Sequence, residues 1–188
     1  MEADGIGGGV NFITKTPPMK TEFKATVGSG YNAKSDKGVY NLGFLYGGRT
    51  KDKKFGYLFN FAHFIRNWST DNFEARRSGD EGVFRLELRD YNGVRKTTGI
   101  NTAFEYVLSP KTTFYLKGMY GTLSDDETHY KHRIRFDKFS SVNNTARVEL
   151  QNIHNLLITE LTSVSLGAVH NLNKGKIDWD LSYYDNKF

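Results

Sequence analysis

The sequence predicts an all-β protein whose strands form an antiparallel, up-and-down meander. Apolar residues recur at every second position through most of the 188 residues, as they do in half-buried strands, and helical spacing is hard to find. The chain contains 14 Phe, 11 Tyr and 19 Gly, which is typical of extended strands joined by many turns. Short connectors also alternate strictly with longer polar ones, which indicates strands running up and down between two ends of one sheet.

Seven strands are expected, at residues 21–33, 38–49, 54–68, 82–108, 112–136, 145–170 and 176–188. The second expected strand places four apolar or aromatic side chains on one face: Tyr40, Leu42, Phe44 and Tyr46. The third places five on one face: Phe55, Tyr57, Phe59, Phe61 and Ile65. The residues on one face of the fourth expected strand are Ile100, Thr102, Phe104, Tyr106 and Leu108. Those on one face of the fifth are Phe114, Leu116 and Tyr120. The seventh alternates most cleanly, with Ile177, Trp179, Leu181 and Tyr183 opposite Asp178, Asp180 and Ser182.

Two kinds of connector separate these strands. Short, tight connectors are expected at 48–56, 108–113 and 171–176. Longer, polar connectors are expected at 32–38, 66–82 and 136–145. Their alternation predicts a sheet with a tight-turn end and a loop end.

The length of the strands favours a membrane protein. Three of the expected strands exceed 20 residues, whereas strands in soluble proteins usually have about 5–6. A membrane crossing needs about 9–11 tilted residues, so the surplus would project beyond the bilayer. Lys or Arg at the bilayer midplane costs about 2–4 kcal/mol, so we expect Asp178 and Asp180 to point inward and Trp179 and Tyr183 toward lipid. The alternative is that the aromatic residues form the core of a soluble sheet.

Composition and charge argue against other classes of protein. The longest apolar runs fall short of about 18 residues, so no transmembrane helix is expected, and residues 1–15 lack the features of a signal peptide. The net charge of +5 is interleaved with acidic and aromatic residues, unlike the basic face of a nucleic-acid-binding protein. Cysteine is absent from the sequence, which removes disulfide and thiol chemistry.

Enzymatic chemistry is not expected. We find no catalytic, cofactor-binding or metal-binding pattern in the sequence. His129 and His132 are three residues apart on an expected strand, so they would face opposite sides and could not bind one ion together. The stretch "GIGGG" lacks the lysine and the following helix of a phosphate-binding loop.

The N-terminal stretch "MEADGIGGGVNFITKTP" resembles the end of the plug domain in TonB-dependent receptors of the Gram-negative outer membrane. In that family a Met-acid-Ala segment precedes two glycines and a strand that leads into the barrel. The residues that match this junction here are Gly7, Gly8, Gly9, Val10, Asn11, Thr14 and Lys15. Gly9 departs slightly, because the family more often has a small polar or branched residue there. Residues 86–127 are similar to the barrel of the same family, with two long strands around a turn that contains Pro110.

The resemblance implies a domain organisation and a function. Residues 1–18 would be the C-terminal end of a plug domain, and residues 19–188 the N-terminal portion of a transmembrane β-barrel, about 7 of about 22 strands. The chain would then be an internal piece of a longer receptor, and we expect it to aggregate or fail to insert alone. The implied function is energised uptake of a scarce solute, such as a siderophore, vitamin, glycan or peptide. The implied partners are outer-membrane lipid, lipopolysaccharide and, through the missing N-terminal part, the TonB complex; no cofactor or nucleic acid is expected.

Basic and aromatic residues near the loop end are the candidates for ligand contact. They are Arg66, Trp68, Arg76 and Arg77 in the second expected loop, and Lys131, Arg133 and Arg135 below the third. Such groups suit anionic chelates or sugars; alternatively, the loops bind lipopolysaccharide phosphates or no ligand. Two other function classes stay open: a passive outer-membrane channel or structural barrel, which needs no plug, and a soluble carbohydrate-binding β-sandwich.

Overall fold

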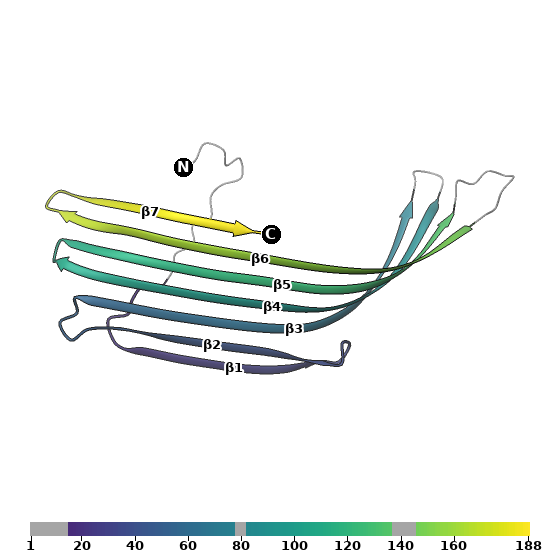
Figure 1. The fold of residues 1–188 in the computed structure, drawn as a ribbon, viewed down its shortest axis with the longest axis horizontal. Helices are drawn as coiled ribbons and strands as arrows, with labels where there is room; N and C mark the ends of the chain where they lie inside the picture. The colour runs from purple at the N-terminus through teal and green to yellow at the C-terminus, as the bar shows by residue number, and fades with distance from the viewer. Residues whose placement is uncertain (1–14, 78–81, 137–145) are drawn as a thin grey trace.

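The strands of the computed structural model form one antiparallel sheet. The structure describes residues 15–77, 82–136 and 146–188. The strands are β1 (Glu22–Asn32), β2 (Lys37–Arg49), β3 (Phe55–Arg77), β4 (Val83–Ser109), β5 (Thr112–Phe136), β6 (Ala146–Leu172) and β7 (Gly175–Lys187). Each strand pairs with the next one along the chain (Figure 1). The predicted up-and-down meander is therefore confirmed, and the sheet is open, with β1 and β7 at its edges.

One predicted boundary is wrong by several residues. The polar composition of residues 69–77 predicts a connector, but β3 continues to Arg77. From Ser69 to Arg76, every residue of β3 has a partner on β4, and the register shifts only between Arg76 and Arg77. The candidate residues expected in this loop, Arg66, Trp68, Arg76 and Arg77, therefore lie on a strand. The polar composition of residues 69–77 suggests a loop, but these residues form a strand because they pair with an equally polar stretch of β4.

Strand length divides the sheet into two regions. β1, β2 and β7 contain 11, 13 and 13 residues, whereas β3 to β6 contain 23 to 27. The surplus of the four long strands forms a four-stranded extension that turns away from the rest of the sheet (Figure 1). We call this extension the distal wing: residues 66–77, 83–97, 123–136 and 146–161.

The register assigns the side chains to two faces of opposite character. Residues that pair directly in an antiparallel sheet point to the same face. One continuous row of pairs runs from β2 to β6: Phe44, Phe61, Ile100, Tyr120 and Thr162. We call this side the apolar face and the opposite side the polar face. The predicted alternation of β7 is confirmed, because Trp179 and Tyr183 lie on the apolar face, and Asp178 and Asp180 on the polar face.

A stretch of the apolar face, here named the apolar band, carries no Asp, Glu, Lys or Arg. It consists of every second residue within 23–31, 38–48, 55–65, 98–108, 112–122, 162–172 and 175–183. Aromatic side chains contact one another across the strands of this band, as in Phe23–Phe44 and Phe59–Phe104, with ring centroids 5.6 and 5.5 Å apart. The same stretches place charges on the polar face, including Lys24, Lys117 and Asp180.

The described residues contain almost no buried core, because they form a single layer. Within the described strands, the buried apolar side chains are those of Leu58, Ala103 and Ala168. Large apolar side chains of the band stay exposed instead, for example Leu181 at 70% and Tyr183 at 64%. An exposed apolar surface of this extent marks an interaction site rather than an ordinary soluble surface. None of the described residues forms a helix long and apolar enough to cross a membrane.

Residues 15–18 pack on the polar face near the tight turns. Pro17 is buried, and its carbonyl accepts a hydrogen bond from Arg49 Nη2 over 3.3 Å. Arg49 also forms an ion pair with Glu105 on the same face. A Cβ added to Gly56 would lie 2.8 Å from Pro17 Cβ, and one added to Gly47 would lie 2.9 Å from Pro18 Cδ. The two glycines therefore leave the space in which the proline segment sits.

Candidate functional site

The distal wing brings several of the predicted ligand-contact residues together. Arg76 lies on β3, and Lys131, Arg133 and Arg135 lie on β5. Through the register of β4, all four point to the polar face. β3 and β5, which are separated in the sequence, thus place basic side chains on one surface. The predicted loop setting is wrong for Arg76, whereas Lys131, Arg133 and Arg135 lie on a strand below the third loop, as predicted.

Arg66 and Trp68 lie elsewhere on the polar face, nearer the apolar band. Arg66 pairs with Arg95, and Trp68 pairs with Gly93. A Cβ added to Gly93 would come within 2.6 Å of Trp68 Cε2, so the indole ring lies against the backbone of β4. Trp68 is therefore held by packing on a glycine and does not join the basic residues near the end of the wing. Arg77 is the last residue of β3 and lies directly after the point at which the register between β3 and β4 shifts.

The centre of the basic cluster is Glu87, whose side chain is completely buried. Arg133 Nε donates a hydrogen bond to Glu87 Oε1 over 2.7 Å, and Arg89 Nε donates to Oε2 over 2.9 Å. Arg85 Nε lies 3.2 Å from Oε1. Three guanidinium groups from two neighbouring strands thus converge on one carboxylate.

Two further glutamates extend this network across the wing. Arg89 Nη2 lies 2.8 Å from Glu74 Oε2 on β3, and Arg133 Nη1 donates to Glu149 Oε2 on β6 over 3.0 Å. The ion pairs therefore connect all four strands. The wing has no second layer to pack against in the described residues, and on its polar face this network joins the side chains of neighbouring strands.

The network keeps Glu87 ionised. Burial opposes the charged form, but the hydrogen bonds from Arg89 and Arg133 outweigh it and lower the pKa of Glu87 to about 2. The pKa of Glu149 is also lowered, chiefly by its hydrogen bond from Arg133. The pKa of the Arg133 guanidinium is raised by the same two carboxylates. The cluster therefore carries fixed charges throughout the physiological pH range.

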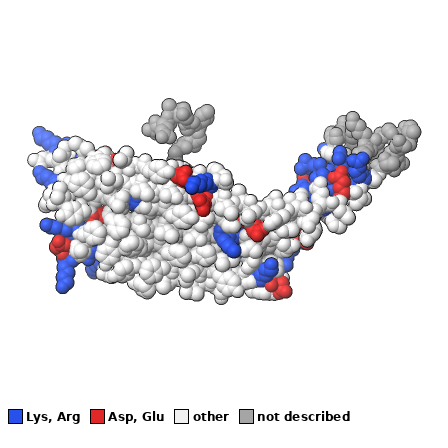
Figure 2. Space-filling view, viewed as in Figure 1, with Lys and Arg blue, Asp and Glu red and all other residues white. Residues whose placement is uncertain are grey.

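Charge is distributed unevenly over the sheet. Figure 2 shows Lys, Arg, Asp and Glu gathered at the end of the distal wing, while much of the visible surface between the two ends of the sheet is uncharged. The members of the cluster that the sequence analysis did not select are Glu74, Arg85, Glu87, Arg89, Arg147 and Glu149. The alternation in "VFRLELRDY" places Arg85, Glu87 and Arg89 on one face, so the signal was present, but their partners depend on the register.

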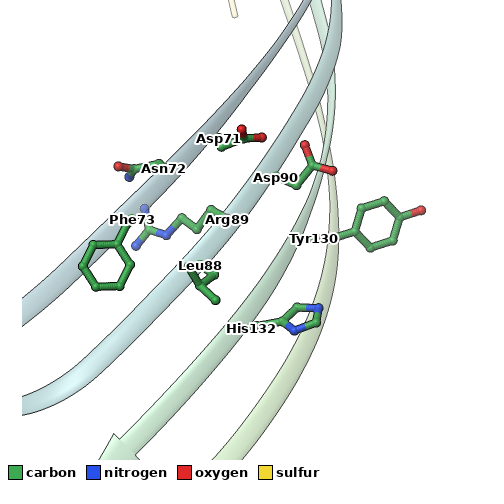
Figure 3. Close-up of a pocket in the computed structure, with 8 residues that line it drawn as sticks. All are labelled: Asp71, Asn72, Phe73, Leu88, Arg89, Asp90, Tyr130 and His132. Atoms are coloured by element: carbon green, nitrogen blue, oxygen red, sulfur yellow. The ribbon is translucent and has the colours of Figure 1, made fainter. Parts of the chain in front are cut away.

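A shallow hollow of about 760 Å³ lies on the wing. Its lining comes from β3, β4 and β5 and includes Phe73, Leu88 and Tyr130, together with Asp71 and Asp90 (Figure 3). These five side chains belong to the apolar face, opposite the basic cluster. One side of the wing thus mixes apolar side chains with carboxylates, which include Asp71, Asp90, Asp126 and Glu160, and the other side is rich in arginine.

The prediction that His129 and His132 lie on opposite faces of the sheet is confirmed. His129 lies on the polar face, where its Nδ1 is 3.0 Å from Glu127 Oε1, and His132 lies on the other face. Among the described residues, no group of three or more His, Asp or Glu is arranged to hold a metal ion.

The predicted plug junction falls mostly beyond the described ranges. Gly7, Gly8, Gly9, Val10, Asn11 and Thr14 lie outside the described residues. Lys15 is described, and its Nζ is 2.9 Å from Glu22 Oε1 at the start of β1. Glu22 lies on the polar face, since it pairs with Gly47. The described end of this segment therefore contacts the polar side of the sheet.

Comparison with known proteins gives no relative for this chain. No family model, no curated protein and no solved structure matches it.

Proposed function

We propose that the chain forms part of the wall of a transmembrane β-barrel in the outer membrane of a Gram-negative bacterium. The apolar band would contact hydrocarbon, and the polar face would line the interior. One observation carries this proposal: within the apolar band, seven adjacent strands lack Asp, Glu, Lys and Arg on one face, whereas the same stretches place Lys117 and Asp180 on the other. A charge on a lipid-facing position is costly, but one on a lumen-facing position is tolerated.

The height of the band fits a bilayer. On β3 to β6 it spans 55–65, 98–108, 112–122 and 162–172, at least 11 residues on each strand, and uncharged residues of the same face continue to Ser69 on β3 and Ser124 on β5. A tilted membrane strand needs about 9–11 residues. The distal wing would then project from the membrane. This accounts for strands that are much longer than one crossing requires.

The edge of the band also crosses the sheet obliquely. Ile65 belongs to the band on β3, but its partner Lys96 on β4 lies beyond the edge. Thr122 belongs to the band on β5, but its partner Glu160 on β6 lies beyond. The edge of the band therefore lies closer to the tight turns on β4 than on β3, and closer to them on β6 than on β5. This is expected if the strands are tilted by about 35–45° to the membrane normal, because a boundary parallel to the membrane then crosses the pairing at an angle.

The open edges of the sheet support a larger barrel. β1 and β7 each have one unpaired side in the described part of the chain. Unpaired backbone groups are not tolerated in hydrocarbon, so further strands must cover both edges in a membrane. A soluble carbohydrate-binding β-sandwich is less consistent, because the described strands form one layer instead of two packed sheets.

Within this class, we propose a TonB-dependent receptor for energised uptake of a scarce solute. The proposal rests on the resemblance of the N-terminal stretch to the end of a plug domain. It is supported by Pro17, which is buried against the polar face beside Arg49. A chain that enters along the interior wall is what a plugged barrel requires, whereas a passive channel has no need of it.

The two tryptophans test the membrane placement. Trp179 lies in the apolar band and Trp68 on the polar face of the wing. With the variants Trp68→Phe and Trp179→Phe of the full-length receptor, stripped of its other tryptophans and placed in lipid vesicles, we expect brominated lipids to quench Trp179 and not Trp68. Aqueous acrylamide should show the reverse preference. Quenching of Trp179 by acrylamide without an effect of brominated lipid would refute the placement.

Genetic interaction tests the uptake function. Deleting the gene should slow growth on a limiting nutrient in cells with TonB and cause no additional defect in cells without TonB. A passive channel would give the same added defect in both backgrounds. That second outcome would contradict the receptor proposal while leaving the membrane placement intact.

A further inference from the structure

Four arginines form a continuous row across the distal wing. Arg76 pairs with Arg85, Arg85 pairs with Arg135, and Arg135 pairs with Arg147. We call this set the arginine row: Arg76, Arg85, Arg135 and Arg147. Each member occupies a different strand, and all four share the polar face. Neighbouring strands are about 4.8 Å apart, so the row extends over about 14 Å.

Such a row is unfavourable by itself, because like charges directly opposite one another destabilise a sheet. The next row toward the band is Glu74, Glu87, Arg133 and Glu149, and it offsets part of the charge. Arg76 Nε lies 2.8 Å from Glu74 Oε1, and Arg135 Nη1 lies 3.6 Å from Glu149 Oε1. Arg147 forms no ion pair with any described residue.

The wing retains excess positive charge on this face. The third row, Asn72, Arg89, Lys131 and Gln151, adds two more basic groups and no acidic one. Three rows therefore hold seven basic and three acidic side chains. A network that served only to join the strands would be closer to neutral, with one carboxylate for each arginine. The excess indicates that the face is arranged to meet negative charge from outside the described residues.

Three of the four arginines of the row are also in contact with a carboxylate before any ligand binds. Arg76 is paired with Glu74, Arg85 with Glu87, and Arg135 with Glu149. A guanidinium presents five donors, and a carboxylate that engages one edge leaves the other edge free for a second anion. Preorganised side chains lose less conformational entropy on binding. The row therefore combines fixed spacing, permanent charge and donors suited to bidentate contacts.

We propose that the arginine row binds a multivalent anion whose phosphate or carboxylate groups repeat at a spacing of about 5 Å. A ligand with several acidic groups engages neighbouring guanidinium groups at once, whereas a single phosphate reaches one or two. The row would bind anions whether or not the apolar band contacts lipid, so this site can fail while the membrane placement holds, and the reverse.

Calorimetric titration of the detergent-solubilised protein in which this chain forms part of a complete barrel, at low ionic strength, tests the site. The probes are tripolyphosphate, citrate and inorganic phosphate. We expect tripolyphosphate or citrate to bind at least about tenfold more tightly than inorganic phosphate, and affinity to fall steeply with salt. The stronger of the two identifies phosphate or carboxylate groups as the natural ligand chemistry. Equal affinity for all three probes would overturn the proposal.

Variants locate the binding on the row. Arg135→Gln and Arg147→Gln should each weaken binding about fivefold, and the double variant about 25-fold, since each removes a charged donor. Lys24→Gln is the matched control, because Lys24 is also an exposed basic residue of the polar face but lies far from the wing. An equal loss in the control, or none in the row variants, would contradict the site. Arg147→Lys keeps the charge and should retain intermediate affinity, which separates lost binding from misfolding.

Discussion

The two regions of the sheet use the same alternation for opposite purposes. In the proximal region, the part of the sheet that contains the apolar band, the side chains of the band are exposed and uncharged, and the charged residues of the same stretches lie on the polar face. In the distal wing, the polar face carries the buried Glu87 and its arginines, while the apolar face mixes Phe73 and Leu88 with Asp71 and Asp90. The backbone pairing is thus the same in both regions, and only the character of the side chains on each face changes along the strands.

The difference explains how each region is stabilised. A single layer cannot bury a hydrophobic core, so the proximal region needs an apolar medium or a partner to cover its band. The wing needs no such cover on its polar face, because ion pairs that involve Glu87, Glu74 and Glu149 connect its four strands. The comparison predicts that substitutions in the two regions fail for different reasons.

The largest effect is expected for a charge in the apolar band. Leu166 lies in the middle of the band on β6, and Ser165 is its neighbour on the polar face. Leu166→Arg should cost about 2–4 kcal/mol of folding free energy in lipid and reduce assembly into membranes. Ser165→Glu should be tolerated, because it places a charge on the polar face directly opposite Lys117. Urea titration of the protein in lipid vesicles measures both, and equal stability of the two variants would remove the distinction between the faces.

Removing the buried carboxylate should weaken the wing alone. Glu87→Gln leaves Arg85, Arg89 and Arg133 without their shared counter-charge. We expect amide hydrogen exchange in residues 83–91 to accelerate about tenfold or more, because hydrogen bonds to charged groups are lost. Exchange in the apolar band should stay unchanged. Uniform acceleration across the sheet would indicate that the two regions do not behave as separate units.

Acid should weaken the wing in a defined pH range. The folded-state pKa of Glu87 is about 2, below its ordinary value of 4.5, so its contribution is complete above about pH 4.5 and is lost as pH falls toward 2. The lowered pKa of Glu149 acts in the same direction. Pepsin digestion between pH 4.5 and 2 should cut the wing progressively, and Glu87→Gln should remove most of that pH dependence. A wing cut equally at both limits would argue against this role.

The smallest effect concerns the packing of Trp68. A Cβ at Gly93 would meet the indole at 2.6 Å, whereas a Cβ at Gly99 meets no atom within 4 Å. Both glycines lie on the polar face of β4. In the Trp179→Phe background, Gly93→Ala should shift the emission of Trp68, and Gly99→Ala should leave it unchanged. An equal shift in both variants would mean that the ring does not rest on Gly93.

The sequence is informative about the strands and less so about the cluster. Period-two alternation predicts six of the seven strands within a few residues, because one face of each is consistently apolar, as in β7. It fails for the end of β3, where Asp71 and Glu74 suggest a loop although β4 pairs with them. The arginine row could not be predicted, since its members lie up to 71 positions apart and meet only through the register of three strand pairs.

The arginine row also bears on how the strands find their alignment during assembly. A slip of one position between β4 and β5 would reverse every side chain of one strand relative to the other. Arg133 and Arg135 would then emerge beside Leu86 and Leu88, and Glu87 would lose its counter-ions. A misaligned intermediate of this kind is penalised at many positions at once. The charged wing therefore adds a second penalty against misaligned pairing of the long strands, beyond the one that the apolar band imposes.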